Sequence, residues 1–214
     1  MNRLSLKISA AIAVFAIPAQ ALAHHAMDGK LPSTMAEGML SGLAHPVIGF
    51  DHLAFVVAVG MASVLAGYRF VLPILFIAAT LAGTGLHLMA VNLPMVETVV
   101  AASVVAGGVL VLSGRKNSLA LLAAVFAVAG IFHGYAYGES IVGTETRVLG
   151  AYLAGFAVIQ VVIAIAAGAI IVDELGKRAA AFANAPARIV GGMVAGVGML
   201  ILGEQALAVI GLAT

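Results

Sequence analysis

The sequence His45-Pro46-Val47-Ile48-Gly49-Phe50-Asp51-His52 places two imidazoles and a carboxylate directly before an apolar run that extends from Leu53 to Leu65. The whole segment is otherwise apolar enough to cross a bilayer. An ionisable side chain at the centre of a membrane helix costs about 2.5–3.5 kcal/mol, so such residues rarely occur there without a function. The stretch therefore predicts a membrane helix that carries a polar site.

The spacing of these residues predicts how their side chains face. On a continuous helix His45 and His52 are seven residues apart and lie about 20° from each other around the axis. Asp51 lies to one side of that stripe, where it could face a neighbouring helix. Pro46 removes a helical hydrogen bond and predicts a kink. We interpret the motif as half of a divalent-metal site.

The composition extends the membrane interpretation to the whole chain. Of its 214 residues, 63% are hydrophobic and only 9% are charged, whereas soluble domains carry about 25% charged residues; the mean hydropathy is +1.17. The net charge of +1 and the lack of a basic patch argue against a nucleic-acid partner. Because there is no cysteine, any metal must be held by nitrogen and oxygen ligands. The sequence contains no phosphate-binding loop of the kind that ATPases use.

Residues 1–23 have the pattern of a cleavable secretory signal: basic residues open it, a short apolar core follows, and Ala21-Leu22-Ala23 forms a small-residue cleavage site. The alternative is an uncleaved first helix, but the apolar run is too short to span a bilayer comfortably. Cleavage would leave residues 24–35 as an exterior segment. It would begin with His24 and His25, which either chelate a divalent ion together with the free amine or form a polar tail.

Residues 36–214 are predicted to form one permease domain with six apolar stretches of the length that a bilayer requires. We place them at 36–66, 70–90, 96–113, 118–137, 147–172 and 188–212. The fold class is therefore all-α integral membrane, a six-helix bundle. In the sixth stretch, Gly192-Met193-Val194-Ala195-Gly196 predicts close helix packing, either inside one chain or between the chains of an oligomer.

Basic residues predict the orientation, because Lys and Arg concentrate in cytoplasmic loops. Six of them follow the first, third and fifth stretches or begin the sixth: Arg69, Arg115, Lys116, Lys177, Arg178 and Arg188. The opposite side carries only Lys30 and Arg147. We therefore expect a bacterial inner-membrane protein whose mature amino terminus and carboxyl terminus, Thr214, are both periplasmic.

With this orientation, the histidines and buried acids lie in the exterior half or the middle of the membrane. His133 in the fourth stretch joins the first motif as a candidate ligand, and His87, Glu97 and Glu139 near the exterior helix ends are weaker candidates. Imidazole and carboxylate suit Ni²⁺, Co²⁺, Zn²⁺ and Cu²⁺. The same side chains could instead form a closed structural zinc site or make helix-packing hydrogen bonds, each worth about 0.6 kcal/mol.

The motif His45-x5-Asp51-His52, together with Phe132-His133-Gly134, resembles the HupE/UreJ family, small membrane proteins implicated in nickel supply to hydrogenase and urease. The stretch from Pro94 to Gly107 also resembles the third span of that family. The resemblance covers essentially the whole mature chain. It implies permease function, with His45, Asp51, His52 and His133 as the matched functional positions.

The second motif departs from the pattern FHGxAHGxE that is common among relatives. Tyr137 stands in place of the second histidine, Ser140 stands in place of the acid, and Glu139 comes one residue early. Glu139 is therefore the weaker candidate ligand, whereas the position of His133 is unaffected.

The sequence thus predicts a permease that imports Ni²⁺, with Co²⁺ as the alternative cargo, for metalloenzyme maturation. Without an ATPase element, entry would follow the ion gradient and the membrane potential, which contributes about 4.6 kcal/mol per 100 mV to a divalent cation. Neutral imidazole is the ligating form, so acid pH should weaken binding. The alternative is a non-transporting metal-binding or assembly protein, which the lack of ionisable residues in the inner half favours. Neither an enzyme nor a prosthetic group is expected; the expected partners are the metal ion and the lipid bilayer.

Overall fold

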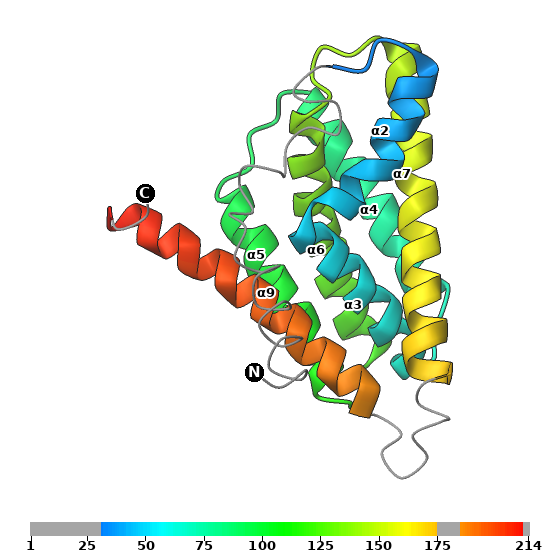
Figure 1. The fold of residues 1–214 in the computed structure, drawn as a ribbon, viewed down its shortest axis with the longest axis vertical. Helices are drawn as coiled ribbons and strands as arrows, with labels where there is room; N and C mark the ends of the chain where they lie inside the picture. The colour runs from blue at the N-terminus through cyan, green and yellow to red at the C-terminus, as the bar shows by residue number, and fades with distance from the viewer. Residues whose placement is uncertain (1–30, 175–184, 212–214) are drawn as a thin grey trace, which may run out of the picture.

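The computed structural model describes residues 31–174 and 185–211. The predicted signal at 1–23, with His24 and His25, lies outside these residues. The described part is all-helical and contains no strand, as the composition predicts. In chain order its helices are α2 (Met35–Ile48), α3 (Phe50–Ala66), α4 (Val71–Leu88), α5 (Val96–Leu112), α6 (Leu119–Glu139), α7 (Thr146–Ala167), the π-helical η2 (Gly168–Glu174) and α9 (Ala185–Val209) (Figure 1).

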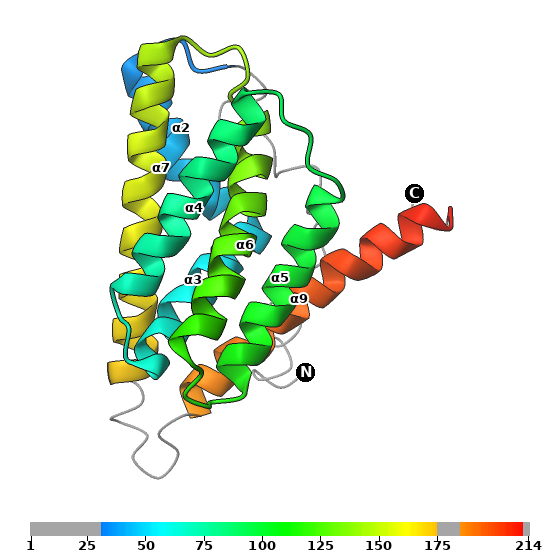
Figure 2. The same cartoon turned by 180° about the vertical axis from the view of Figure 1, so that it is seen from behind.

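The helices form an up-and-down bundle with an oblique helix on one flank. The closest pairs are α4 with α6, α2 with α7, and α5 with α9. Figures 1 and 2 show α9 crossing α5 at an angle, with the carboxyl-terminal half of α9 extending away from the bundle. Helix α2 runs inward from the flank beside α7 and α3 continues from it, so that their junction lies about halfway between the two ends of the bundle (Figure 1).

Glycines bring the paired helices into backbone contact. A Cβ atom on Gly42 of α2 would overlap the carbonyl oxygen of Tyr152 in α7, and one on Gly134 of α6 would overlap that of Thr80 in α4. Small residues at such positions are the usual means by which membrane helices approach closely. Gly42 precedes His45 by one helical turn and Gly134 follows His133, so these contacts fix where both imidazoles lie.

The predicted first stretch is two helices, α2 and α3, bent by 81° at Gly49. Gly49 leaves the helical conformation, with φ −74° and ψ 107°, and Pro46 in the preceding turn has no N–H to continue the ladder. A Cβ on Gly49 would lie only 2.7 Å from Cδ2 of His52. The expectation that His45 and His52 share one face of a continuous helix is therefore wrong, because the two residues belong to different helices.

Four helical segments of the described part are long and apolar enough to cross a membrane: α4, α6, α7 continued to Val172, and α9. A fifth span results if the bent pair α2–α3 is counted as one. Helix α5 is apolar but has only 17 residues, the short end of the range that spans a bilayer. The chain is thus an integral membrane protein. The count of six spans stays a prediction, although every predicted stretch coincides with helix.

Four of the five described basic residues gather at one end of the bundle, and Arg147, at the start of α7, lies at the other. The loops after α3 and α5 lie at the same end as the start of α9 (Figures 1 and 2), which groups Arg69, Arg115, Lys116 and Arg188. The Nε–H of Arg188 donates to the carbonyl of Leu112 over 3.2 Å. This grouping is the one that the predicted orientation requires; the orientation itself stays a prediction, and Lys177 and Arg178 lie outside the described residues.

The half of the bundle toward this basic end holds the apolar core. Phe55, Phe76 and Phe126 are buried there, and the ring centroid of Phe55 lies 5.4 Å from that of Phe76 and 6.0 Å from that of Phe126. Met61, Leu72 and Leu122 are fully buried in the same cluster. The polar residues predicted to be functional lie above this core.

The glycines of α9 divide into two sets. Gly191 and Gly198 lie against the α5 backbone, whereas a Cβ on Gly196 or Gly203 would meet open space. Close packing by this helix therefore occurs within the chain, and it uses glycines other than the Gly192–Gly196 pair that the sequence singled out. Oligomerisation through this helix stays a prediction.

Candidate metal centre

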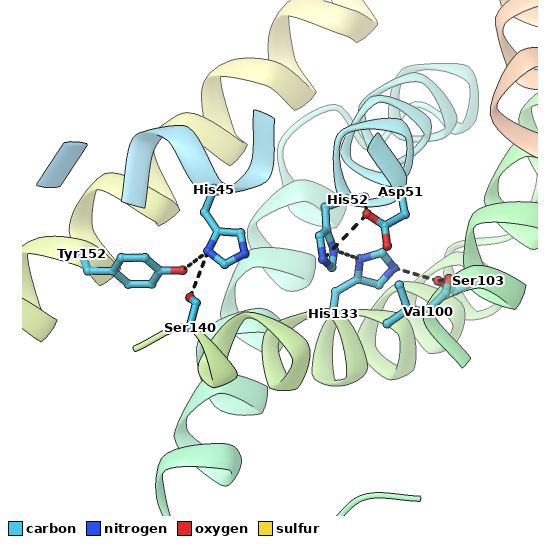
Figure 3. Close-up of polar contacts among 8 residues, drawn as sticks. All are labelled: His45, Asp51, His52, Val100, Ser103, His133, Ser140 and Tyr152. Carbon is cyan, nitrogen blue, oxygen red and sulfur yellow. Dashed lines mark hydrogen bonds and ion pairs between the residues drawn. The ribbon is translucent and has the colours of Figure 1, made fainter. Parts of the chain in front are cut away.

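His45 lies in the last turn of α2 and is held by two hydroxyls from other helices. Its Nδ1 is 2.8 Å from the Tyr152 hydroxyl of α7 and 3.2 Å from Oγ of Ser140, which follows α6. Ser140 in turn donates to the carbonyl of Tyr137 over 3.0 Å. Figure 3 shows the opposite edge of the His45 ring turned toward the His52 side. The α2 end of the site is thus anchored on α6 and α7.

Asp51 lies in the first turn of α3, immediately beyond the bend. Its Oδ1 accepts the backbone N–H of His52 over 2.8 Å and lies 3.9 Å from Nε2 of the same histidine. The new helix start is what makes this position suitable, because the positive end of a helix dipole stabilises a carboxylate. The side chain of Asp51 is 21% exposed, so the carboxylate is the most accessible group of the cluster.

His52 and His133 meet ring to ring in the middle of the bundle. Their Nδ1 atoms are 2.8 Å apart, although the residues come from different helices, α3 and α6 (Figure 3). His133 is fully buried and stacks on Phe55 with the ring centroids 4.6 Å apart. The imidazole pair therefore sits directly on the apolar core.

Ser103 of α5 extends this contact to a third helix. Its Oγ lies 2.8 Å from Nε2 of His133 and donates to the carbonyl of Val100 over 2.7 Å. A continuous polar chain thus runs from Asp51 through His52 and His133 to Ser103 (Figure 3).

Tyr137 fills the space between the two histidines of the first motif. Its ring centroid lies 4.8 Å from that of His45 and 4.1 Å from that of His52. The residue is fully buried, and its hydroxyl has no hydrogen-bond partner among the described residues. A buried hydroxyl without a partner costs about 1–3 kcal/mol, so this group is unusual in a packed site.

The weaker candidates lie apart from this cluster. His87, in the last turn of α4, packs on Tyr135 with ring centroids 4.5 Å apart. Glu97 and Glu139 are exposed, at the start of α5 and the end of α6 respectively. The structure thus brings His45, Asp51, His52 and His133 together and leaves His87, Glu97 and Glu139 nearer the end of the bundle opposite the basic loops.

The cluster is closed on itself rather than arranged around an ion. Within residues 31–174 and 185–211, no group of three or more His, Asp or Glu side chains has the geometry of a metal site. The nitrogens of His52 and His133 that face each other are occupied by their mutual hydrogen bond. An ion that uses all four predicted residues would therefore require them to rearrange.

The family model of the HupE / UreJ protein matches residues 12–201. Protein HupE of Rhizobium leguminosarum bv. viciae is 33% identical over 198 residues, which cover 92% of this chain and 97% of that protein. The chain belongs to the HupE/UreJ family. HupE/UreJ membership was predicted from the two histidine motifs, and the matched region contains all four residues of the cluster. No solved structure matches the chain.

Three residues that hydrogen-bond to the histidines of this cluster were not predicted as site residues: Ser103, Ser140 and Tyr152. Ser140 and Tyr137 are the two positions at which the chain departs from the common FHGxAHGxE pattern, and both contact His45. That shared departure was the available signal for Ser140. For Ser103, the sequence feature that could have identified it was a hydroxyl within a predicted membrane helix. No feature of the sequence marked Tyr152.

Proposed function

We propose that the chain is a permease that imports a divalent cation, in the first place Ni²⁺, through a site built from His45, Asp51, His52 and His133. The observation that carries this proposal is the buried contact of His52 with His133, with a carboxylate 3.9 Å from the first ring. Two imidazoles and a carboxylate at membrane depth are costly to bury without a ligand to bind. They are also the ligand types that Ni²⁺ and Co²⁺ accept.

The choice of Ni²⁺ rests on the family. The HupE/UreJ resemblance implies nickel supply to hydrogenase or urease, and the curated relative bears the name HupE. Co²⁺ takes the same ligands in similar geometry and is the alternative cargo.

The proposed direction of transport is from the acidic end of the bundle toward the basic end. Glu97 and Glu139 are exposed at the end opposite Arg69 and Arg115, and exposed carboxylates raise the local cation concentration. Asp51, the most accessible group of the cluster, would receive the ion next. With the basic end in the cytoplasm, the membrane potential drives this movement.

Onward movement requires the apolar core to rearrange. Phe55 stacks on His133 and is itself packed between Phe76 and Phe126, so a packed apolar layer lies beneath the imidazole pair. In channels, apolar constrictions act as gates because they exclude water until they widen, and this layer would have to open in the same way. The same observation favours the second candidate function, a protein that binds the ion at this depth and does not release it inward.

Uptake of radiolabelled nickel into cells that lack other importers tests the proposal. We expect His52→Ala to abolish uptake, and His87→Gln, at the weaker candidate position, to retain most of it. Equal uptake by the wild type and a well-expressed His52→Ala variant would contradict the proposed transport site. Purified protein in liposomes that contain a metal-sensitive dye separates the two functions, because binding without an internal signal would support the non-transporting protein.

A further inference from the structure

The hydrogen bond at Ser103 has only one direction. A serine hydroxyl carries a single hydrogen, and the carbonyl of Val100 can only accept, so the 2.7 Å contact between them uses that hydrogen. Oγ of Ser103 must therefore accept in its second contact, 2.8 Å from Nε2 of His133. It follows that Nε2 of His133 carries a hydrogen.

The hydrogen on Nε2 of His133 in turn determines which nitrogen of His52 carries a hydrogen. His133 is fully buried against Phe55, an environment that favours the neutral ring, and a neutral imidazole carries a hydrogen on one nitrogen only. With Nε2 protonated, Nδ1 of His133 is bare. The 2.8 Å contact between the two Nδ1 atoms then requires the hydrogen to sit on Nδ1 of His52.

The remaining nitrogen of His52 is the one beside Asp51. When the neutral His52 ring carries its hydrogen on Nδ1, Nε2 presents a lone pair, and this atom lies 3.9 Å from Oδ1 of Asp51. That separation is too long for a hydrogen bond. In an octahedral ion with bonds of about 2.1 Å, adjacent ligand atoms are about 3 Å apart and opposite ones about 4 Å. A nitrogen lone pair and a carboxylate oxygen are therefore within reach of one cation.

We infer that Ser103 and His133 form a relay that positions His52, so that Nε2 of His52 and the carboxylate of Asp51 are the first protein ligands of the ion. This inference rests on the proposed function and separates the role of His133 from that of Asp51 and His52. His133 acts through His52, as the acceptor that fixes its tautomer and ring orientation, and Ser103 fixes His133 in the same way. Ligating histidines commonly depend on such an acceptor, whose loss weakens metal affinity about 10–100-fold.

The tautomers can be tested in the ion-free protein by ¹⁵N NMR of histidine-labelled protein in detergent micelles. We expect His52 to carry its hydrogen on Nδ1 and His133 on Nε2. Ser103→Ala should leave His133, and hence His52, as a mixture of tautomers, whereas Ser103→Thr should restore the wild-type pattern. In Ni²⁺ titrations Ser103→Ala should bind about 10–100-fold more weakly, and Ser103→Thr should bind nearly as the wild type does.

A second pair of variants separates a relay from a ligand at position 133. The amide oxygen of Asn lies near the place of Nδ1 and can accept from His52, so His133→Asn should retain most of the Ni²⁺ affinity that His133→Ala loses. If His133→Asn binds as weakly as His133→Ala, or if ion-free His52 carries its hydrogen on Nε2, the inference is wrong. If the tautomers are as expected but the His52→Ala variant still takes up nickel, only the proposed function is contradicted.

Discussion

Gly134 lies in direct contact with the carbonyl oxygen of Thr80, so that α6 and α4 meet backbone to backbone. The contact is reinforced by Thr84, whose hydroxyl donates to the carbonyl of Gly134 over 2.8 Å. Because Gly134 directly follows His133, this approach sets the depth and the rotation of the central imidazole. The helix pairing is thus part of the geometry of the site.

Gly134→Ala should therefore both destabilise the protein and impair the site. The added methyl group has no room beside Thr80, and overpacking of this kind costs about 1–3 kcal/mol. Thermal unfolding of the purified protein measures the first effect and nickel uptake the second. Gly85→Ala is the matched control, because a Cβ there meets open space; if both variants unfold at the same temperature, the backbone contact is not as described.

Asp51→Asn should weaken Ni²⁺ binding at least 10-fold and leave the fold intact. The amide oxygen can still accept the N–H of His52, which Oδ1 of Asp51 accepts over 2.8 Å, but the negative charge is lost. Isothermal titration with Ni²⁺ and circular dichroism measure the two effects. Glu139→Gln removes an exposed charge and serves as the comparison. Equal losses in both variants would mean that general surface charge, and not the cluster, governs binding.

Tyr137→Phe should leave the stability of the ion-free protein unchanged or raise it by about 1 kcal/mol. The hydroxyl that this variant removes is buried without a partner in the described structure, and removing such a group relieves its desolvation cost. Tyr137→Ala should instead cost about 3–5 kcal/mol, because it empties the space between His45 and His52. Unfolding of both variants in detergent provides the measurement. A clear loss of stability in Tyr137→Phe would indicate that the hydroxyl has a partner.

Leucine substitutions on the two faces of α9 should have different effects. Gly198→Leu places a side chain against the α5 backbone and should lower the unfolding temperature, whereas Gly203→Leu projects into open space and should not. Crosslinking of membranes then tests the predicted oligomer: loss of crosslinked species in Gly203→Leu, with the fold intact, would support an interface on that face. Unchanged species would contradict an interface there.

The helices could be predicted from the sequence because long apolar runs between polar loops leave the backbone few alternatives in a membrane. The stretch predicted at 70–90 is α4, Val71–Leu88, and the one predicted at 118–137 is α6, Leu119–Glu139. The break at Gly49 could not be predicted in this way, because hydropathy carries no information about φ and ψ. Pro46 indicated a kink, but not that the helix would stop and restart.

The ionisable residues of the candidate site could be predicted from the sequence, but its hydroxyl-bearing residues could not. Ionisable side chains at membrane depth are rare, so His45, Asp51, His52 and His133 were conspicuous in the sequence. Ser103 and Tyr152 carry no charge and do not stand out in the sequence, and only the packing of α5 and α7 brings them to an imidazole. The rotation of each helix about its axis decides which ring nitrogen each hydroxyl contacts, and residue spacing does not predict that rotation.

The bend at Gly49 has a consequence for the distance between the two histidines of the first motif. In one unbroken helix, the rise of about 1.5 Å per residue would hold His45 and His52 about 10 Å apart along the axis, whatever the rest of the bundle did. Across the bend, their ring centroids are 6.4 Å apart, and this distance follows the angle between α2, which is anchored on α7, and α3, which is anchored in the apolar core. The separation of the two imidazoles is therefore set by the angle of the bend and not by the fixed rise of a helix, so any movement of α2 relative to α3 changes it.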